Sequence, residues 1–250
     1  KNKGNSIINI AGLSVGLAVF LLVSVFVYSE MSYDSHYKRS EDIYRVAVSF
    51  SHDDMEDLAS VPLPLAPAIK EEIPEAEETV RLVEKGGALF SAGSRKIMEE
   101  KLYYADPGFS NIFDLKFIYG REDLAAPDKI ALSKTLSEKY FGSENPLGKI
   151  ITVNNNKTLI VNGVFKDLPK ESHFNPSMLI SFATLRSTED STRITNWHSI
   201  GSFYTYVLLK PGSSKAEVNK KLSRLEEKYY DEESAAVWNY FLQAVKEIHL

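Results

Sequence analysis

The first hydrophobic positions of the chain form one long run without interruption. Residues 5–29 include no charged residue, and most positions over 7–28 are Ile, Leu, Val, Phe, Ala or Gly. As a helix rising about 1.5 Å per residue, residues 7–28 span roughly 33 Å, enough to cross a hydrocarbon core about 30 Å thick. The pattern predicts a transmembrane helix over residues 7–29, surrounded by membrane lipid, after a short cytoplasmic flank over residues 1–6.

Two other interpretations fit this run less well. A buried helix of a soluble domain seldom continues past six turns without a charge. A cleaved signal peptide has an apolar region of about 7 to 15 residues and a small-residue cleavage site, but here the run is longer and ends in VYSE at residues 27–30. We therefore expect an uncleaved anchor.

The charges beside the run indicate its orientation. Lys1 and Lys3 precede it, and Glu30 and Asp34 follow it. The positive-inside rule then places the N-terminus in the cytoplasm, although Lys38 and Arg39 just beyond the run dilute the signal. Residues 30–250 are accordingly expected outside the cytoplasm.

Inside the run, the sequence GLSVG at residues 12–16 matches two motifs. As G-x-S-x-G it resembles the nucleophile elbow of serine hydrolases, which needs a strand ending just before the serine. As G-x-x-x-G in an apolar helix it is a close-packing face. Because the surroundings are helical and apolar, Gly12, Ser14 and Gly16 are predicted to pack against another helix, and Ser14 is not a nucleophile.

After the helix the pattern changes to strands and short helices. Residues 43–50 alternate like a half-buried strand, and Leu65, Ile69 and Ile73 recur every four positions as in a short helix that stops at Pro74. Residues 79–83 form the next predicted strand. The order strand, helix, strand begins an α+β layer.

The sequence pattern changes in the middle of the chain, and Gly86-Gly87 marks where the change begins. Residues 129–132 read as a strand, followed by a helix that Ser133 caps and Gly142 ends. Residues 150–153 and 158–161 flank a four-residue loop, NNNK, and predict a hairpin. This stretch reads as an inserted, β-rich module.

The sequence pattern of residues 43–83 returns from about residue 174. Residues 203–209 predict a strand, and Ser214 with Glu217 forms a capping box that opens a helix. The apolar stripe of that helix faces the core; its members are Val218, Leu222, Leu225 and Tyr229. Residues 239–245 fit either a strand or a helix, and we prefer the strand.

Composition excludes several functions. Beyond the helix stand 34 Asp and Glu against 27 Lys and Arg, the chain's 29 less Lys1 and Lys3, so that part carries about seven excess negative charges. This balance gives no electrostatic basis for binding nucleic acid or an anionic membrane surface. The chain has no cysteine, which excludes disulfides, a lipid-anchoring cysteine, thiol catalysis and zinc–thiolate sites. The sequence does not start with Met, and we expect it to be a fragment of a longer chain.

Motifs that carry chemistry are hard to find. The stretch GSENPLGKI at residues 142–150 has five residues between its glycines and Ile after the Lys, so it is not a phosphate-binding loop. The five histidines are scattered, and His52-Asp53-Asp54, the one local cluster of potential ligands, is expected to be a solvated turn. A Ser-His-Asp set could form only in the fold, and nothing nominates one. We expect no catalytic, metal-binding or cofactor-binding residue in this chain.

Several short stretches, none specific alone, occur in a characteristic order along nearly the whole chain. In order and spacing they resemble the first transmembrane helix and periplasmic core domain of MacB-like ABC transporter permeases of the FtsX-like superfamily, especially Bacteroidetes-type versions. The stretches are residues 9–17, 30–34, 43–46, 74–75 with 80–81, 104–106 leading to Phe109 and Phe113, 139–142 leading to 145–149, 161–169 leading to 172–174, and 247–250.

The resemblance implies an α+β fold in two parts. A discontinuous porter-like subdomain would comprise residues 30–86 and 172–250, and a β-rich sabre-like subdomain, residues 87–171, would be inserted into it. A second membrane helix is expected soon after Leu250. The sequence departs from MacB itself in showing no nucleotide-binding domain ahead of the helix.

The resemblance also implies a non-enzymatic role, in export or mechanotransmission, in the bacterial inner membrane with residues 30–250 in the periplasm. ATP would be bound and hydrolysed by a separate cytoplasmic ATPase subunit. The other expected partners are a second permease protomer, forming a dimer, and a periplasmic adaptor protein.

Transmission of motion requires a stiff link between helix and domain, and residues 28–37 contain no Gly or Pro to interrupt one. Tyr33, Asp34, Tyr44 and Arg45 are the candidates for fixing the helix to the domain. Alternatively, they are ordinary surface and core residues.

Two other functions fit the same layout. A membrane-anchored receptor would also place a sensor domain between two helices, but with a ligand pocket and a cytoplasmic signalling module behind it. An anchored hydrolase would need a nucleophile and a base that meet in a cleft.

Overall fold

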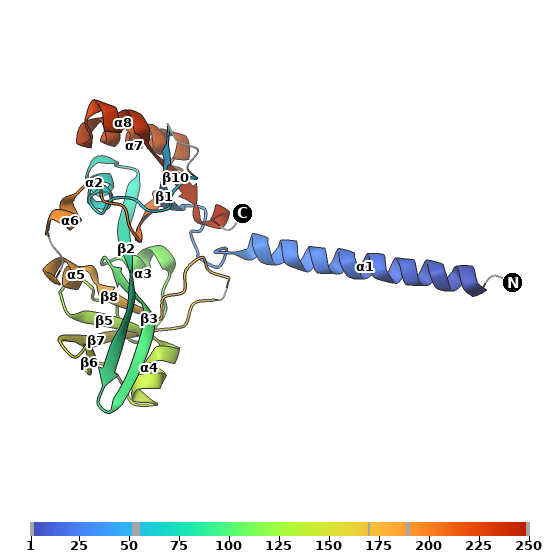
Figure 1. The fold of residues 1–250 in the computed structure, drawn as a ribbon, viewed down its shortest axis with the longest axis horizontal. Coiled ribbons are helices and arrows are strands. Elements are labelled where there is room, and N and C mark those ends of the chain that lie inside the picture. Colours follow the sequence, from blue (N-terminus) through green and yellow to red (C-terminus); the bar gives the residue numbers. More distant parts are fainter. Residues whose placement is uncertain (1–2, 52–55, 170, 189–190, 249–250) are drawn as a thin grey trace.

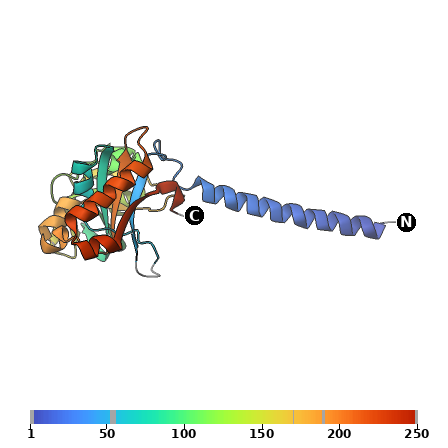
Figure 2. The same ribbon diagram turned by 90° about the horizontal axis from the view of Figure 1, so that it is seen from above.

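A long helix projects from a β-rich domain (Figures 1 and 2). The structure is a computed structural model that describes residues 3–51, 56–169, 171–188 and 191–248. Helix α1 (Lys3–Ser32) contains the apolar segment Ile10–Val27, long and apolar enough to cross a membrane, whose side chains are all exposed in this chain. The remaining helices are α2 (Leu65–Glu72), α3 (Phe109–Phe113), α4 (Lys134–Phe141), α5 (Phe182–Thr188), α6 (Ser191–Thr195), α7 (Lys215–Tyr229), α8 (Glu232–Val237) and the 3-10 helix η1 (Val245–Glu247).

The described strands form one ten-stranded sheet in the order β10-β1-β9-β2-β3-β8-β5-β7-β4, with β6 paired to β2 and β7. The mixed α+β architecture predicted from the sequence is confirmed. The strands are β1 (Ile43–Phe50), β2 (Ala76–Ala92), β3 (Arg95–Ala105), β4 (Phe117–Gly120), β5 (Lys129–Ser133), β6 (Ile150–Val153), β7 (Lys157–Phe165), β8 (Met178–Ser181), β9 (Phe203–Leu209) and β10 (Trp238–Ala244).

Strand β2 connects the two ends of this sheet. Its first half pairs with β9 and its second half with β3, so one continuous strand passes from one group of strands to the other. Gly86-Gly87 was predicted to mark a break, but both glycines lie inside β2. At Gly87 the backbone of β3 comes so close that a Cβ would stand 2.6 Å from the Glu99 carbonyl oxygen. This glycine therefore permits strand pairing, and the subdomain boundaries at 86/87 and 171/172 stay predictions.

The sheet end formed by β10, β1 and β9 is covered by α2, α7 and α8 (Figure 1). The predicted stripe of α7 supplies Val218, Leu222 and Leu225 to this core, with Tyr229 packed against it. Ser214 caps α7 by accepting from the Glu217 N–H, while the Glu217 carboxylate pairs with Lys220. Packing of an apolar helix face on the sheet holds this end together.

Helix α7 also covers the free edge of β10. The carboxylate of Glu226 accepts from the Tyr240 N–H, and Asn219 Oδ1 accepts from the Leu242 N–H at 3.0 Å. Glu226 is buried, and burial raises its pKa to about 7. The outward N–H groups of an edge strand, which could otherwise pair with another chain, are satisfied here by side chains.

The other end of the sheet is built around β5, β6, β7 and α4. Ser133 accepts from the Leu136 N–H at 3.2 Å, and Gly142 follows the helix with φ +64°, so both predicted ends of α4 are confirmed. The β6–β7 hairpin is confirmed, but Val153 pairs with Lys157, which leaves a loop of three residues where four were predicted. Asn154 and Asn155 both have positive φ, which Asn tolerates well and which closes the tighter loop.

Candidate functional site

The link between α1 and β1, residues 33–42, is here called the junction segment. The sequence predicted a stiff link without interruption, and this prediction is wrong in detail because α1 ends at Ser32 and Asp34 adopts φ +53°. Asp is one of the few residues that tolerate this left-handed conformation, which is why the chain can turn here without Gly or Pro. The link is held by side-chain contacts and not by a continuous helix.

Asp34 is fully buried and bonds to the segment that precedes β8. Its N–H donates to the Glu171 carbonyl at 3.0 Å. Its carboxylate accepts from Ser172 Oγ and the His173 N–H, both at 3.2 Å, and lies 2.8 Å from His173 Nδ1. The first turn after α1 is thereby fixed to residues about 140 positions later.

The network continues from His173 into the sheet. The Asp34 carboxylate accepts a hydrogen bond from the Nδ1–H of His173. In a neutral imidazole the other nitrogen, Nε2, then carries no proton, so it accepts from the Tyr206 hydroxyl, 2.8 Å away on β9. Tyr37 Oη lies 2.8 Å from Ser172 Oγ. Burial raises the pKa of Tyr37 and of Tyr206 well above the usual value, so both stay neutral donors.

An aromatic cluster encloses this network. Phe113, fully buried at the end of α3, contacts Tyr37, Phe174 and Tyr206 edge-on, with ring centroids 5.3, 4.7 and 5.0 Å away. Such edge-to-face pairs add about 0.5–1.5 kcal/mol each beyond the area that they bury. The aromatic rings cover the polar chain, and Asp34, His173 and Tyr206 are almost fully buried.

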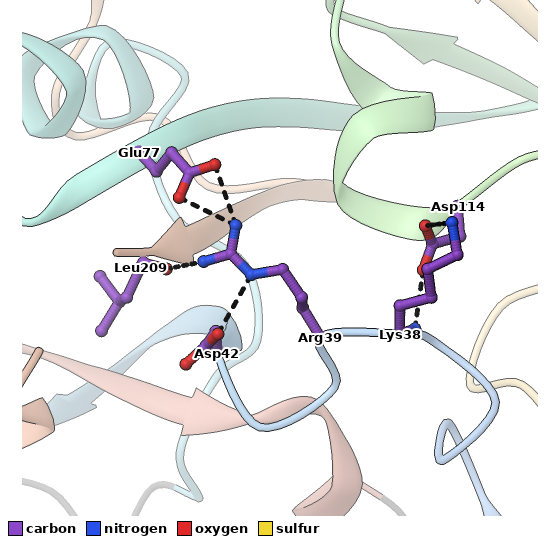
Figure 3. A network of polar contacts seen from close by, with 6 residues as sticks. All are labelled: Lys38, Arg39, Asp42, Glu77, Asp114 and Leu209. Atoms are coloured by element: carbon purple, nitrogen blue, oxygen red, sulfur yellow. Dashed lines mark hydrogen bonds and ion pairs between the residues drawn. The ribbon is translucent and has the colours of Figure 1, made fainter. Parts of the chain in front are cut away.

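Two cations of the junction segment reach other parts of the sheet (Figure 3). Arg39 donates to both oxygens of Glu77 at 2.9 and 2.8 Å, to Asp42 Oδ2 at 3.1 Å and to the Leu209 carbonyl at 2.6 Å. Its planar guanidinium thus joins the junction segment to β2 and to the end of β9. The backbone N–H of Lys38 donates to Asp114 Oδ2, just after α3, at 2.7 Å, and the Lys38 ammonium group lies 3.5 Å from Asp114 Oδ1.

The last described part of the chain meets the same segment. Val245 of η1 is buried in the cluster that includes Tyr37, and Lys246 is paired with Glu41. In both views η1 lies beside the domain end of α1 (Figures 1 and 2). The two ends of the domain therefore meet at one place.

The structure separates the four candidates for coupling. Asp34 is central to the network, and Tyr33 precedes it as a half-buried residue. Tyr44 and Arg45 are neighbours on β1 and point to opposite faces of the sheet. Tyr44 packs against the core that includes residues of α2 and α7. Arg45 lines a cleft of about 560 Å³ together with His173 and Tyr206. It also donates to Gln243 Oε1 at 2.6 Å.

The three predicted helix-packing residues lie on α1 away from the domain. Gly12, Ser14 and Gly16 are exposed, and a Cβ on either glycine would have open space around it. Gly12 and Gly16 are four residues apart and share one helix face. Among the described residues none packs against the two glycines, and the packing role of Gly12, Ser14 and Gly16 stays a prediction.

Sequence reasoning missed Arg39, Ser172, His173 and Tyr206 as site residues. Arg39 was considered only for its charge, and His173 only as one of five scattered histidines. The family-like stretch over residues 172–174 was the available signal, but it did not indicate the partner of His173. The partner of His173 is Asp34, and only the folded chain brings these two residues together.

The Asp34–His173 pair does not extend to a serine nucleophile. Tyr206 occupies the Nε2 side, while Ser172 Oγ bonds to Asp34 and Tyr37 instead. These residues therefore do not form the hydrogen-bonded Ser-His-Asp arrangement of the hydrolases. Over the described ranges no group of three potential metal ligands comes together, and His52-Asp53-Asp54 lies outside those ranges.

Comparison with known proteins gives a consistent result. The family of MacB-like periplasmic core domains matches residues 6–225. Solved structures of similar fold include the following three. A domain described as part of a permease protein from Porphyromonas gingivalis shares 24% identity at TM-score 0.71, covering 83% of this chain and 92% of that one.

The second similar structure is the periplasmic region of MacB from Actinobacillus actinomycetemcomitans, with 14% identity, TM-score 0.60 and coverage of 84% and 91%. The third is the extracellular domain of the noncanonic ABC-type transporter YknZ from Gram-positive bacteria, with 18% identity, TM-score 0.56 and coverage of 80% and 99%. No curated protein matches the chain.

Proposed function

The chain belongs to the family of MacB-like periplasmic core domains, and from this premise we propose that it couples a membrane helix to an extracytoplasmic domain in an ABC transporter permease. In this proposal α1 crosses the inner membrane and residues 30–250 lie in the periplasm. ATP hydrolysis by a cytoplasmic ATPase subunit moves α1, and the domain carries the motion to a substrate or to a periplasmic adaptor. The chain supplies no catalysis and holds no cofactor.

The observation that carries the proposal is the way the junction segment is fixed. Within ten residues after α1, Asp34, Lys38 and Arg39 bond to the segment before β8, to the end of α3, and to β2 and β9. These attachments are spread over both halves of the sheet. A displacement of α1 would therefore move the whole domain and not one loop of it.

The subdomain plan supports the same mechanism. A porter-like part over residues 30–86 and 172–250 and a sabre-like part over residues 87–171 would share strand β2, which runs through both. A continuous strand resists bending between the parts. The domain would then act as a stiff lever, with Gly12, Ser14 and Gly16 packing α1 against a neighbouring helix or a second protomer.

The experiment uses the complete permease purified from its own membrane. An ABC ATPase should copurify with it, and ATP turnover should change the distance between spin labels on the domains of two protomers. Arg39→Ala should reduce that change while ATP hydrolysis continues. Copurification with a kinase or a methyl-accepting module, and no ATPase, would instead identify a sensor domain and refute the proposal.

A further inference from the structure

A groove lies beside the junction segment and shares Tyr37, Lys38 and Asp114 with the coupling contacts. It has a volume of about 240 Å³ and is lined by three short stretches of chain, residues 36–38, 113–116 and 166–169. Phe113, Leu115 and Leu168 give it an apolar floor. Lys38, Lys116 and Lys166 stand around it, and all three are exposed.

The position of this groove follows from the length of α1. Only the five helical residues 28–32, about 8 Å, separate the end of the apolar segment at Val27 from the end of α1. The headgroup layer on each side of a bilayer is about 5–8 Å thick. With Val27 at the edge of the hydrocarbon core, residues 36–38 lie at the outer margin of the headgroups.

The charges at the groove favour an anion. Residues 30–250 carry a net negative charge, but three lysines line this groove against two aspartates. Asp114 accepts from the backbone N–H of Lys38 and lies 3.5 Å from its ammonium group, and Asp167 accepts from the Thr135 N–H and hydroxyl. Among the residues that the structure describes, the ammonium groups of Lys116 and Lys166 form no ion pair or hydrogen bond. Glu171 and Asp34 face His36 at the rim, and Lys38 is 77% exposed and only 3.5 Å from Asp114.

We propose that this groove binds the headgroup of an anionic phospholipid of the outer leaflet, with the phosphate at Lys116 and Lys166 and the glycerol backbone on the apolar floor. The location selects a lipid over a free phosphate, since only a lipid is concentrated at this height above the bilayer. The lipid would pack against the same segment that joins α1 to the domain. The inference goes beyond the coupling role and requires only that α1 crosses the membrane.

The test uses the full chain in detergent micelles, with equal amounts of palmitoyl-oleoyl phosphatidylglycerol and phosphatidylcholine added, and native mass spectrometry to count retained lipids. The chain should retain phosphatidylglycerol preferentially. Lys116→Gln combined with Lys166→Gln should lower that retention about fivefold or more, because each lysine near a membrane surface contributes roughly a fivefold change in binding.

The matched control is Lys96→Gln combined with Lys139→Gln, which removes two exposed charges on the β3 strand and on α4, away from the groove. It should retain phosphatidylglycerol like the unchanged chain. Lipids that surround α1 contribute equally to all variants, so the difference reports on the groove. Equal retention of the two lipids by the unchanged chain, or equal loss in both double variants, would overturn the proposal. Neither outcome bears on whether an ATPase binds the complete permease.

Discussion

His173 Nδ1 lies 2.8 Å from Asp34 Oδ2, although the two residues are 139 positions apart. Asp34 stands two residues after the end of α1, and His173 passes the contact on to Tyr206 in the sheet. A buried pair at this position ties the orientation of α1 to the core of the domain. Four predictions follow from this contact and from the elements around it.

The first concerns the Asp34 carboxylate. Asp34→Ala leaves the donors on Ser172 and His173 without their buried acceptor and places a Cβ-only side chain at φ +53°, so it should lower the free energy of unfolding by about 3 kcal/mol or more. Asp34→Asn keeps one acceptor oxygen and a residue that tolerates this φ, so its loss should be clearly smaller. Urea unfolding of the full chain in detergent, followed by tryptophan fluorescence, measures both.

Asp34→Gly separates the two causes, since glycine removes the backbone strain but not the unpaired donors. It should remain close to Asp34→Ala. If all three variants unfold at the urea concentration of the unchanged chain, the network does not stabilise the junction.

The second prediction concerns the far end of the chain of bonds. Tyr206→Phe keeps the buried ring but removes the hydroxyl that meets His173 Nε2, and it should cost about 1–2 kcal/mol in the same unfolding experiment. Tyr119→Phe removes a hydroxyl from an exposed tyrosine on β4 and should cost nothing measurable. An equal effect of the two changes would show that the Tyr206 hydroxyl has no structural role.

The third prediction is a pH dependence at the covered edge of β10. Burial raises the pKa of Glu226 to about 7, above its value of 4.5 in the unfolded chain. Between these values the folded protein holds a proton that the unfolded chain releases, so this carboxyl makes the protein less stable as pH rises from about 4.5 to 7. Glu226→Gln should remove that loss.

Melting temperatures from pH 5 to pH 8 test this point, because the variant should gain stability relative to the unchanged chain as pH rises. Glu217→Gln on the exposed face of α7 provides the control and should not gain in this way. A parallel pH dependence in Glu226→Gln and the unchanged chain would contradict the assignment.

The fourth prediction concerns α1. Gly12→Leu combined with Gly16→Leu should disrupt close helix packing and lower the yield of assembled permease from the membrane, while the domain keeps its melting temperature. Ala11→Leu combined with Val15→Leu adds side-chain bulk to the neighbouring face of α1. The permease with this control variant should assemble normally. Full assembly and full transport in the glycine variant would refute a packing role for Gly12 and Gly16.

Local structure was predictable from the sequence wherever a short-range signal controlled it. The strand over residues 43–50, the Ser133 and Ser214 caps and the stripe of α7 each depend on neighbours within one element, and all are confirmed. The half-buried alternation predicted for that strand is wrong, because β1 lies between β10 and β9 and its residues Val46, Ala47 and Val48 are all buried. The strand preferred over residues 239–245 is also confirmed as β10. Gly87 was misread because a glycine that admits a neighbouring strand has the same signature as one in a turn.

The candidate site was predictable only in part. Asp34 could be nominated because it follows the helix directly, but its left-handed backbone and its bond to His173 depend on the folded position of residues far along the chain. Arg39 joins Glu77 and the Leu209 carbonyl, and no local pattern specifies either partner. Contacts that couple parts of a fold are non-local, which is why the sequence alone did not supply them.

The central claim is that the junction segment holds α1 in one orientation on the domain, and a distance measurement tests it most directly. The chain has no cysteine, so spin labels at Val25→Cys and Met98→Cys, both exposed positions on α1 and β3, can be placed without background in the full chain in nanodiscs. Pulsed electron paramagnetic resonance should give one narrow distribution of distances between the two labels. Arg39→Ala should broaden that distribution. A broad distribution in the unchanged chain, or one equally narrow after Arg39→Ala, would contradict the account.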